Sequence, residues 1–332
     1  LRCVALSVAS FQTPRPPWST LFVQLDPRLM ATAALAGRTL MVGLWLALGT
    51  VVLTLLLGRV WCGWICPLGT VLDSITPRRR RSRGQRRLLP QPPERWRAAK
   101  YLLLLVMLFA ALFGSQALIF LDPITIAGRT LGAALWPALG HAVHSVQAVL
   151  YRYEPLWAAL DALDAGVVYP LWHGAQPLFI HAVPVFLLFA LIVALNWWTP
   201  RFWCRYLCPL GGLLGWLSKW AWVRRTVGAE CTSCVLCATR CPTGTIDADN
   251  GFRSDPAECT VCMDCVADCP REGIAFRRVS PWERAPLHGY DPRRREMLAG
   301  LGIAAAGVSL LQVEPVTQLD PPNLLRPPGA TL

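Results

Sequence analysis

Long uncharged apolar segments, separated by polar and arginine-rich stretches, form the dominant pattern of this chain. Three runs without Asp, Glu, Lys or Arg cover residues 40–57, 101–121 and 177–198, and a weaker run rich in alanine and glycine covers 297–313. At about 1.5 Å per helical residue, each of the three is about long enough to cross a hydrocarbon core of roughly 30 Å. The pattern predicts a mostly α fold in which residues 1–225 form a polytopic membrane domain in the lipid bilayer of a bacterial inner membrane.

Composition and charge orient the predicted domain. Hydrophobic residues make up 54% of the 332 residues, charged residues only 16%, and the mean hydropathy is +0.40, as is typical of membrane proteins. The stretch after the first run carries arginines at 78–81, 83, 86 and 87, which the positive-inside rule places in the cytoplasm. Residues 226–280 are then also cytoplasmic, and the C-terminal end is periplasmic. Nucleic-acid or lipid binding is the alternative for these arginines, but no base-reading fold accompanies them, so we expect no nucleic-acid partner.

The apolar part of the chain contains an internal repeat. Residues 59–73 (RVWCGWICPLGTVLD) match residues 201–215 (RFWCRYLCPLGGLLG) in register. A second, weaker match begins with the Leu-Asp-Pro segments at 25–27 and 121–123. The repeat supplies four cysteines: Cys62, Cys66, Cys204 and Cys208. Two interpretations give them chemistry, a shared metal or cluster site and paired redox-active thiols. The third is that they only pack in tight turns beside Pro67 and Pro209, as buried free cysteines often do.

Eight further cysteines form two runs with the spacing C-x2-C-x2-C-x3-C-P. This is the bacterial two-cluster ferredoxin pattern, in which the fourth cysteine of each run ligates the other cluster. Zinc sites usually use separate C-x2-C pairs, and a reducing cytoplasm argues against disulfides. The spacing therefore predicts a small α+β ferredoxin-like domain at residues 226–280 that binds two [4Fe–4S] clusters. The first cluster takes Cys231, Cys234, Cys237 and Cys269, and the second takes Cys259, Cys262, Cys265 and Cys241.

The combination of two W-C-x3-C-P motifs and a two-cluster module resembles the NapH/NosR-type polyferredoxins, over roughly residues 20–280. The resemblance implies a membrane-bound iron–sulfur protein that relays electrons between membrane quinol and iron–sulfur carriers of nitrate or nitrous oxide respiration. Such a protein is an electron-transfer component, or a subunit of a quinol dehydrogenase. Its implied partners are the quinol pool and a periplasmic ferredoxin, cytochrome or reductase. The alternative function is an assembly, maturation or redox-sensing factor for a metalloenzyme.

The C-terminal segment departs from a plain NapH. Residues 291–298 (DPRRREML) lead into the weak apolar run, and we interpret 291–313 as a twin-arginine signal with Arg294 and Arg295 as its pair. An ordinary anchor flanked by cytoplasmic arginines is the alternative. Residues 314–332 resemble the entry to a NapG-type periplasmic ferredoxin, so we expect the chain to be the first part of a fusion between a NapH-like half and a NapG-like half.

Candidates for the protonation chemistry of quinol lie in the segment that we expect outside the cytoplasm. Neutral imidazole is a good proton acceptor and ligand, although histidines that simply face water or headgroups are commoner. No nucleotide-binding loop, Ser-His-Asp order or pair of catalytic carboxylates accompanies them, so catalytic residues stay unassigned. The candidates are His141, His144, His173, His181, Asp122, Asp161 and Asp164.

Overall fold

Helices make up most of the fold, and a small module near the C-terminal side carries the strands. The computed structural model describes residues 21, 23–37, 43–76, 94–114, 117–172, 182–279, 299–303 and 305–306. In the helical part, η marks short 3-10 or π-helical segments. Its elements are α3 (Pro27–Gly37), α4 (Leu44–Leu57), η1 (Trp61–Ile65), α5 (Pro67–Ile75), η2 (Glu94–Arg97), α6 (Ala98–Leu112), η3 (Ala117–Leu121), α7 (Pro123–Arg129), η4 (Thr130–Leu135), α8 (Trp136–Leu150), η5 (Glu154–Leu156), α9 (Trp157–Leu163), η6 (Asp164–Val168), α10 (Tyr169–Leu171), α11 (Ala182–Trp198), η7 (Trp203–Leu207) and α12 (Pro209–Ser218).

The polytopic membrane domain predicted for residues 1–225 is wrong. None of the helices in the described ranges has both the length and the apolar character needed to cross a membrane. The three apolar runs contain α4, α6 and α11, which have 14, 15 and 17 residues. The physical reason is that an uncharged run need not be a single helix. In the run 101–121, Gly114 takes a left-handed conformation (φ +80°) after the end of α6, and the chain continues as the 3-10 turn η3.

Several predicted features lie outside the described residues. They include the arginine tract at 78–87, the proposed twin-arginine pair Arg294 and Arg295, and the whole of 314–332. Of the weak apolar run 297–313, residues 299–303 and 305–306 are described, and they are helical. The topology, the twin-arginine signal and the fusion therefore stay predictions.

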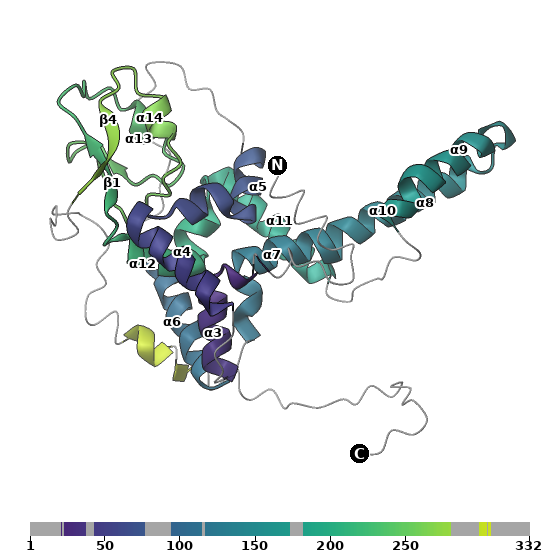
Figure 1. Cartoon of the computed structure of the whole chain (residues 1–332), viewed down its shortest axis with the longest axis horizontal. Coiled ribbons are helices and arrows are strands. Elements are labelled where there is room, and N and C mark those ends of the chain that lie inside the picture. The colour runs from purple at the N-terminus through teal and green to yellow at the C-terminus, as the bar shows by residue number, and fades with distance from the viewer. Residues whose placement is uncertain are drawn as a thin grey trace.

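The two copies of the internal repeat pack together in the centre of the helical part. Helix α12 packs against α3, α4 and α6, and α11 packs against α5, α7 and η4 (Figure 1). The main apolar cluster contains equivalent side chains from both copies, Leu68 with Leu210 and Leu72 with Leu214, all of them fully buried. The repeated sequence thus buries one shared core, so that residues 59–73 and 201–215 lie side by side.

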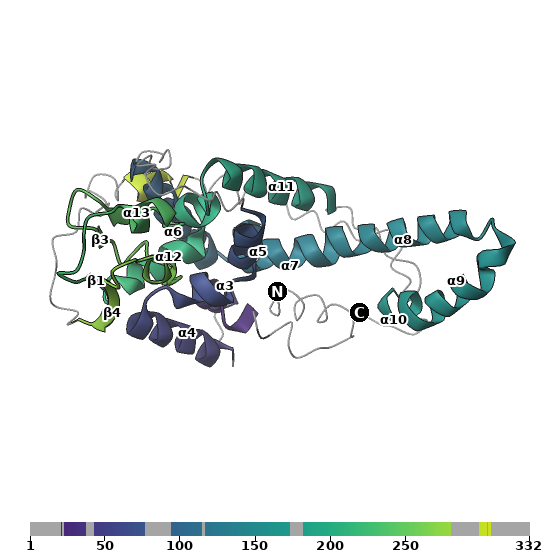
Figure 2. The same cartoon turned by 90° about the horizontal axis from the view of Figure 1, so that it is seen from above.

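A long helical hairpin projects from this core (Figures 1 and 2). The segments α7, η4 and α8 follow one another outward, and α9, η6 and α10 return beside α8. The rings of Trp136 and Trp172 stack with centres 4.9 Å apart, and the Tyr151 hydroxyl donates to the Asp161 carboxylate at 2.8 Å. These contacts join the outgoing and returning arms of the hairpin.

The small module is α+β and begins at strand β1 (Val223–Val227) rather than at residue 226. Strand β1 pairs antiparallel with β4 (Ile274–Arg278), and β2 (Ile246–Asp247) pairs antiparallel with β3 (Arg253–Ser254). Two short helices, α13 (Leu236–Arg240) and α14 (Asp264–Ala267), pack against each other. Each helix follows the second cysteine of one of the two runs, so the module consists of two similar halves.

Candidate functional site

Both cysteine runs curl tightly, because the same two positions of each run have left-handed backbone. In the first run these are Ser233 (φ +54°) and Val235 (φ +64°), and in the second they are Val261 (φ +52°) and Met263 (φ +68°). Such residues cost about 1–3 kcal/mol each when they are not glycine, and they cluster at ligand-holding sites. For the β-branched Val235 and Val261 the conformation is especially unfavourable. The curl turns the three thiols of a run toward one space.

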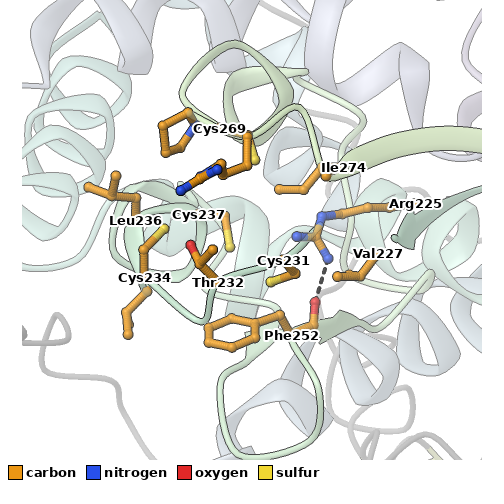
Figure 3. A pocket seen from close by; sticks show the side chains of 14 residues that line it. Arg225, Val227, Cys231, Thr232, Cys234, Leu236, Cys237, Phe252, Cys269 and Ile274 are labelled. Atoms are coloured by element: carbon orange, nitrogen blue, oxygen red, sulfur yellow. Dashed lines mark hydrogen bonds between the residues drawn. The ribbon is translucent and has the colours of Figure 1, made fainter. Parts of the chain in front are cut away.

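A first cavity collects thiols from both runs (Figure 3). It is lined by the first three cysteines of the first run and by the last cysteine of the second, together with apolar side chains. It encloses about 400 Å³ of empty space, part of it open to solvent. The cysteines are Cys231, Cys234, Cys237 and Cys269.

A second cavity mirrors the first. It encloses about 330 Å³, again partly open to solvent, and its cysteines are Cys241, Cys259, Cys262 and Cys265. In each cavity the fourth thiol comes from the opposite run, in the grouping that the spacing predicts. The structure therefore brings each predicted ligand set together, while cluster binding itself stays a prediction.

The thiols of the module suit iron–sulfur clusters. Burial raises the pKa of Cys259 to about 11 and that of Cys262 to about 12, while backbone N–H groups of Val261 and Asp264 oppose these shifts. Thiols of this kind stay protonated at neutral pH until a metal centre displaces the proton. Within the described ranges, no three His, Cys, Asp or Glu side chains meet closely enough to hold a single metal ion. Four soft sulfur donors around a cavity are the donor set of a cubane cluster.

The four repeat cysteines also come together. Each C-x3-C motif begins in a π-helical turn, η1 or η7, and its second cysteine precedes the first turn of the next helix, with Pro67 or Pro209 at the N1 position. The four thiols pack in the shared apolar cluster. Burial, together with the neighbouring Cys204 and Cys62, raises the pKa of Cys66 and of Cys208 well above the usual value. The structure thus places both copies around one thiol-rich centre.

This centre lies directly against the second cysteine run of the module. Gly63, between Cys62 and Cys66, approaches the module so closely that a Cβ atom there would lie 2.2 Å from the carbonyl oxygen of Thr260. The indole N–H of the next residue, Trp64, donates to the carbonyl of Val261 at 2.9 Å. The repeat therefore contacts the loop that connects two ligands of the second cavity.

Buried positive charge surrounds the repeat cysteines. Arg59 and Arg201 occupy equivalent positions, two residues before Trp-Cys in each copy, and both are almost fully buried. Arg59 donates to the carbonyl of Ala257 at 2.9 Å, and Arg201 pairs with Asp73. The buried indole N–H groups of the equivalent residues Trp61 and Trp203 have no acceptor among the described residues. Since both arginines have acidic partners, the two indole N–H groups are the donors left free beside the repeat cysteines.

Comparison with known proteins points to one family. A model described as a 4Fe-4S binding domain matches residues 39–84 and 181–230. NosR of Pseudomonas aeruginosa, named a regulatory protein, is 31% identical over 59% of this chain and 22% of its own length. The ferredoxin-type protein NapH of Escherichia coli is 26% identical over 68% of this chain and 59% of its own length. The family model and these relatives support a NapH/NosR-type polyferredoxin family.

The chain is also similar to the putative electron transport protein YccM of Escherichia coli, with 29% identity over 58% of this chain and 44% of YccM. The chain therefore spans less than two thirds of the length of these curated relatives. Each of the two matched ranges contains one C-x3-C motif, and the second range ends just before Cys231. The match thus reproduces the internal repeat independently. No solved structure gives a significant match.

The remaining predicted residues line neither of the two thiol cavities, although the charge of Asp122 contributes to the raised pKa of Cys66. Asp122 begins helix α7, where it accepts hydrogen bonds from the N–H groups of Ile124 and Thr125, and it pairs with the buried Arg28 at 2.8 Å. Asp161 and Asp164 bind partners within the projecting hairpin, which also carries His141 and His144 on α8. His173 and His181 lie outside the described residues. The structure thus gathers no quinol site from these candidates among the residues that it describes.

Sequence reasoning missed the buried charges that join the repeat to the module. Glu258 is 3% exposed and lies within ion-pair distance of both Arg59 (3.6 Å) and Lys100. The repetition of arginine before Trp-Cys could have pointed to Arg59 and Arg201. Nothing in the local sequence marks Lys100, which lies at the start of an apolar helix and finds its partner 158 positions away.

Proposed function

We propose that this chain is an iron–sulfur electron-transfer protein of a respiratory chain. The observation that carries the proposal is the sorting of eight cysteines into two cavities, each with three thiols from one run and one from the other. Cubane clusters, when bound, supply one-electron redox chemistry. The chain's own residues supply the thiolate ligands and hold two such sites in one module. Similarity to proteins named a putative electron transport protein and a ferredoxin-type protein supports the same function.

The electron donors and acceptors that we propose are quinol on one side and an iron–sulfur carrier on the other. The respiratory chain is of the nitrate or nitrous oxide type that the family resemblance implies. Its partner is a ferredoxin, a cytochrome or a reductase. These partners rest on the family alone, since none of the quinol candidates is gathered into a site in the described part of the chain.

The four repeat cysteines form, in this proposal, a third redox or metal centre. The gathering of four thiols in one apolar cluster, with the two unpaired indole N–H groups of the adjoining tryptophans, supports this centre. The contacts of Gly63 with Thr260 and of Trp64 with Val261 support a short path between this centre and the second cavity. Electrons would then pass from the repeat to the second cavity and on to the first.

A redox-sensing or maturation role is the second candidate function. The specific observation in its favour is the similarity to NosR, whose name describes a regulatory protein. A relay must be reduced by quinol repeatedly and quickly, whereas a sensor need only change state once. The rate of turnover therefore separates the two functions.

Anaerobic purification followed by iron analysis and quinol reduction tests the proposal. We expect about eight irons per chain from the module alone, at four per cubane, and more if the repeat also binds iron. A naphthoquinol should reduce the clusters as fast as catalytic turnover requires, and the electron paramagnetic resonance signal of the reduced clusters should appear on that timescale. Protein that binds no iron would refute the electron-transfer function. Protein that holds iron but is not reduced by the quinol would favour the sensor.

A further inference from the structure

Arg225 lies on the inner face of the module's main sheet. The side chains of Arg225 and Val227 on β1 alternate with those of their neighbours, and their cross-strand partners on β4 are Phe276 and Ile274. Val227 and Ile274 line the first cavity, Phe276 lines the second, and Arg225 lines both. Arg225 therefore occupies the position between the two sets of thiols.

The guanidinium group reaches into this space rather than out to solvent. It extends from β1 beside Cys231 and donates to the carbonyl of Phe252 (Figure 3). Its Nε and its second terminal nitrogen are buried and have no acceptor among the described residues. These donors would be available to the clusters that the thiols of the two cavities would hold.

The charge of Arg225 lies close to thiols of both sets, because its side chain lines the cavity of Cys237 and also the cavity of Cys265.

Acidic partners do not neutralise this cation. In the part of the chain that the structure describes, the ion pairs involve Arg28, Arg59, Lys100, Arg201 and Arg240, and none involves Arg225. An uncompensated, partly buried charge is unfavourable unless an anion balances it. Four thiolates around a cubane carry a net negative charge, which becomes more negative with each electron gained.

We propose that Arg225 is the shared electrostatic partner of both clusters and raises both reduction potentials. The inference rests on the proposed function, since it concerns two occupied cavities. Each cavity takes up one electron, so the module stores two. A positive charge between the two sites attracts the added electron at either of them, so it makes the reduction of both more favourable. Higher potentials at both sites suit a donor such as quinol, which releases two electrons and two protons.

Redox titration of the purified, iron-loaded protein followed by electron paramagnetic resonance tests this role. In Arg225→Gln and Arg225→Met, which remove the charge, both potentials should shift downward. In Arg225→Lys, which keeps the charge, both should stay close to those of the original protein. Arg277→Gln is the matched control, because Arg277 is an exposed arginine of the same sheet whose neighbour across the strands is Arg224, not a cavity residue.

The outcomes separate this inference from the proposed function. Unchanged potentials in both neutral variants, with iron retained, would overturn the role of Arg225 and leave the electron-transfer function intact. Loss of iron in the two neutral variants but not in Arg225→Lys would support a requirement for the charge itself. Loss of iron in all three would show that the arginine only fills space, and would also overturn the inference. Absence of iron from the unaltered protein would refute the proposed function instead.

Discussion

Left-handed backbone at matching positions is the feature that best connects single residues to function in this protein. Val235 and Val261 adopt a conformation that valine disfavours, and each lies beside a cysteine of a different cavity. Strained backbone of this kind clusters at ligand-holding sites, which supports the cluster-binding role proposed for both loops.

The crossed ligand sets give a prediction for single cysteines. Cys241→Ala should damage the same cluster as Cys262→Ala, and Cys269→Ala the same cluster as Cys234→Ala, because each pair lines one cavity. Each variant should lose about four irons, the content of one cubane. Iron analysis and the resonance spectrum of the remaining cluster check the pairing. A spectrum for Cys241→Ala that matches Cys234→Ala would contradict it.

The repeat cysteines should behave as one unit. Replacing any one of Cys62, Cys66, Cys204 or Cys208 by Ser should remove the same spectroscopic signal completely, since a shared centre needs all its ligands. About eight irons should remain in the module. Ser74→Ala, at an exposed position of α5, is the control and should change neither quantity. Full metal content and full electron transfer in the Ser variants would show that these cysteines only pack.

At the scale of elements, the same unit is built twice. A π-helical turn leads to a cysteine in extended conformation and then to a helix with proline at N1, in η1–α5 and again in η7–α12. The two units differ in their neighbours. Gly63 in the first copy contacts the module, whereas Arg205, at the equivalent position of the second, is buried within the helical part. The first copy of the repeat therefore provides this contact with the module.

Gly63→Ala tests this docking contact. The added methyl group would lie 2.2 Å from the carbonyl oxygen of Thr260, which is a backbone atom and cannot easily shift. We expect a loss of about 1–3 kcal/mol in the free energy of unfolding, as for other overpacked sites, and a changed spectrum for the second cluster. Gly49→Ala in α4 is the matched control, because nothing lies within 4 Å of its new methyl group. It should be neutral or stabilise by up to about 1 kcal/mol. Equal stability of the two variants would show that the module does not dock there.

At the scale of the whole molecule, buried ion pairs join the module to the helical part. Lys100 comes from helix α6, Arg59 from the start of the first repeat copy, and Glu258 from the residue before the second cysteine run. Ser218 adds a hydrogen bond to the carbonyl of Pro256 at 2.7 Å. Because ion pairs in such a buried place must match in geometry, they fix the orientation of the module more than they add to stability.

Glu258 should make stability depend on pH in the acidic range. Burial alone would raise its pKa, but the charges of Lys100, Arg59 and Arg97 outweigh burial and hold the pKa below the usual value. A carboxyl whose pKa is lower in the folded state stabilises above its unfolded pKa of about 4.3. That contribution is lost as the pH falls through the folded value. Burial lowers the pKa of Lys100 to about 8, so the lysine stays charged throughout this window.

The measurement is the free energy of unfolding of Glu258→Gln between pH 7 and pH 4. At pH 7 the variant should lose about 3–5 kcal/mol, since it leaves buried cations without their partner. The difference from the original protein should begin to shrink at the acidic end of this range. Glu230→Gln, at an exposed position of the same module, should stay within about 0.5 kcal/mol at every pH. A difference between Glu258→Gln and the original protein that grows toward acid would contradict the assignment.

The sequence by itself determined which residues belong together chemically. The spacing of the eight cysteines is a local property, because a run of three thiols two residues apart must curl, and the pairing of the fourth follows from the two-cluster pattern. The internal repeat is likewise visible in the sequence, and it pointed to Cys62, Cys66, Cys204 and Cys208 as candidates for one site. The structure places these four in one apolar cluster. The mostly helical character followed from long apolar runs.

Only the tertiary structure decided where the helices end, which charged side chains are buried and how the module contacts the helical part. Counting uncharged residues gave three membrane spans, but helix length depends on turns such as the one at Gly114, and the described helices are too short. The burial of Lys100, Arg59 and Glu258 depends on segments more than 150 positions apart. The place of Arg225 between two cavities follows from strand register and from the packing of both runs on one sheet. These features depend on contacts between distant segments, which no local pattern of residue types specifies.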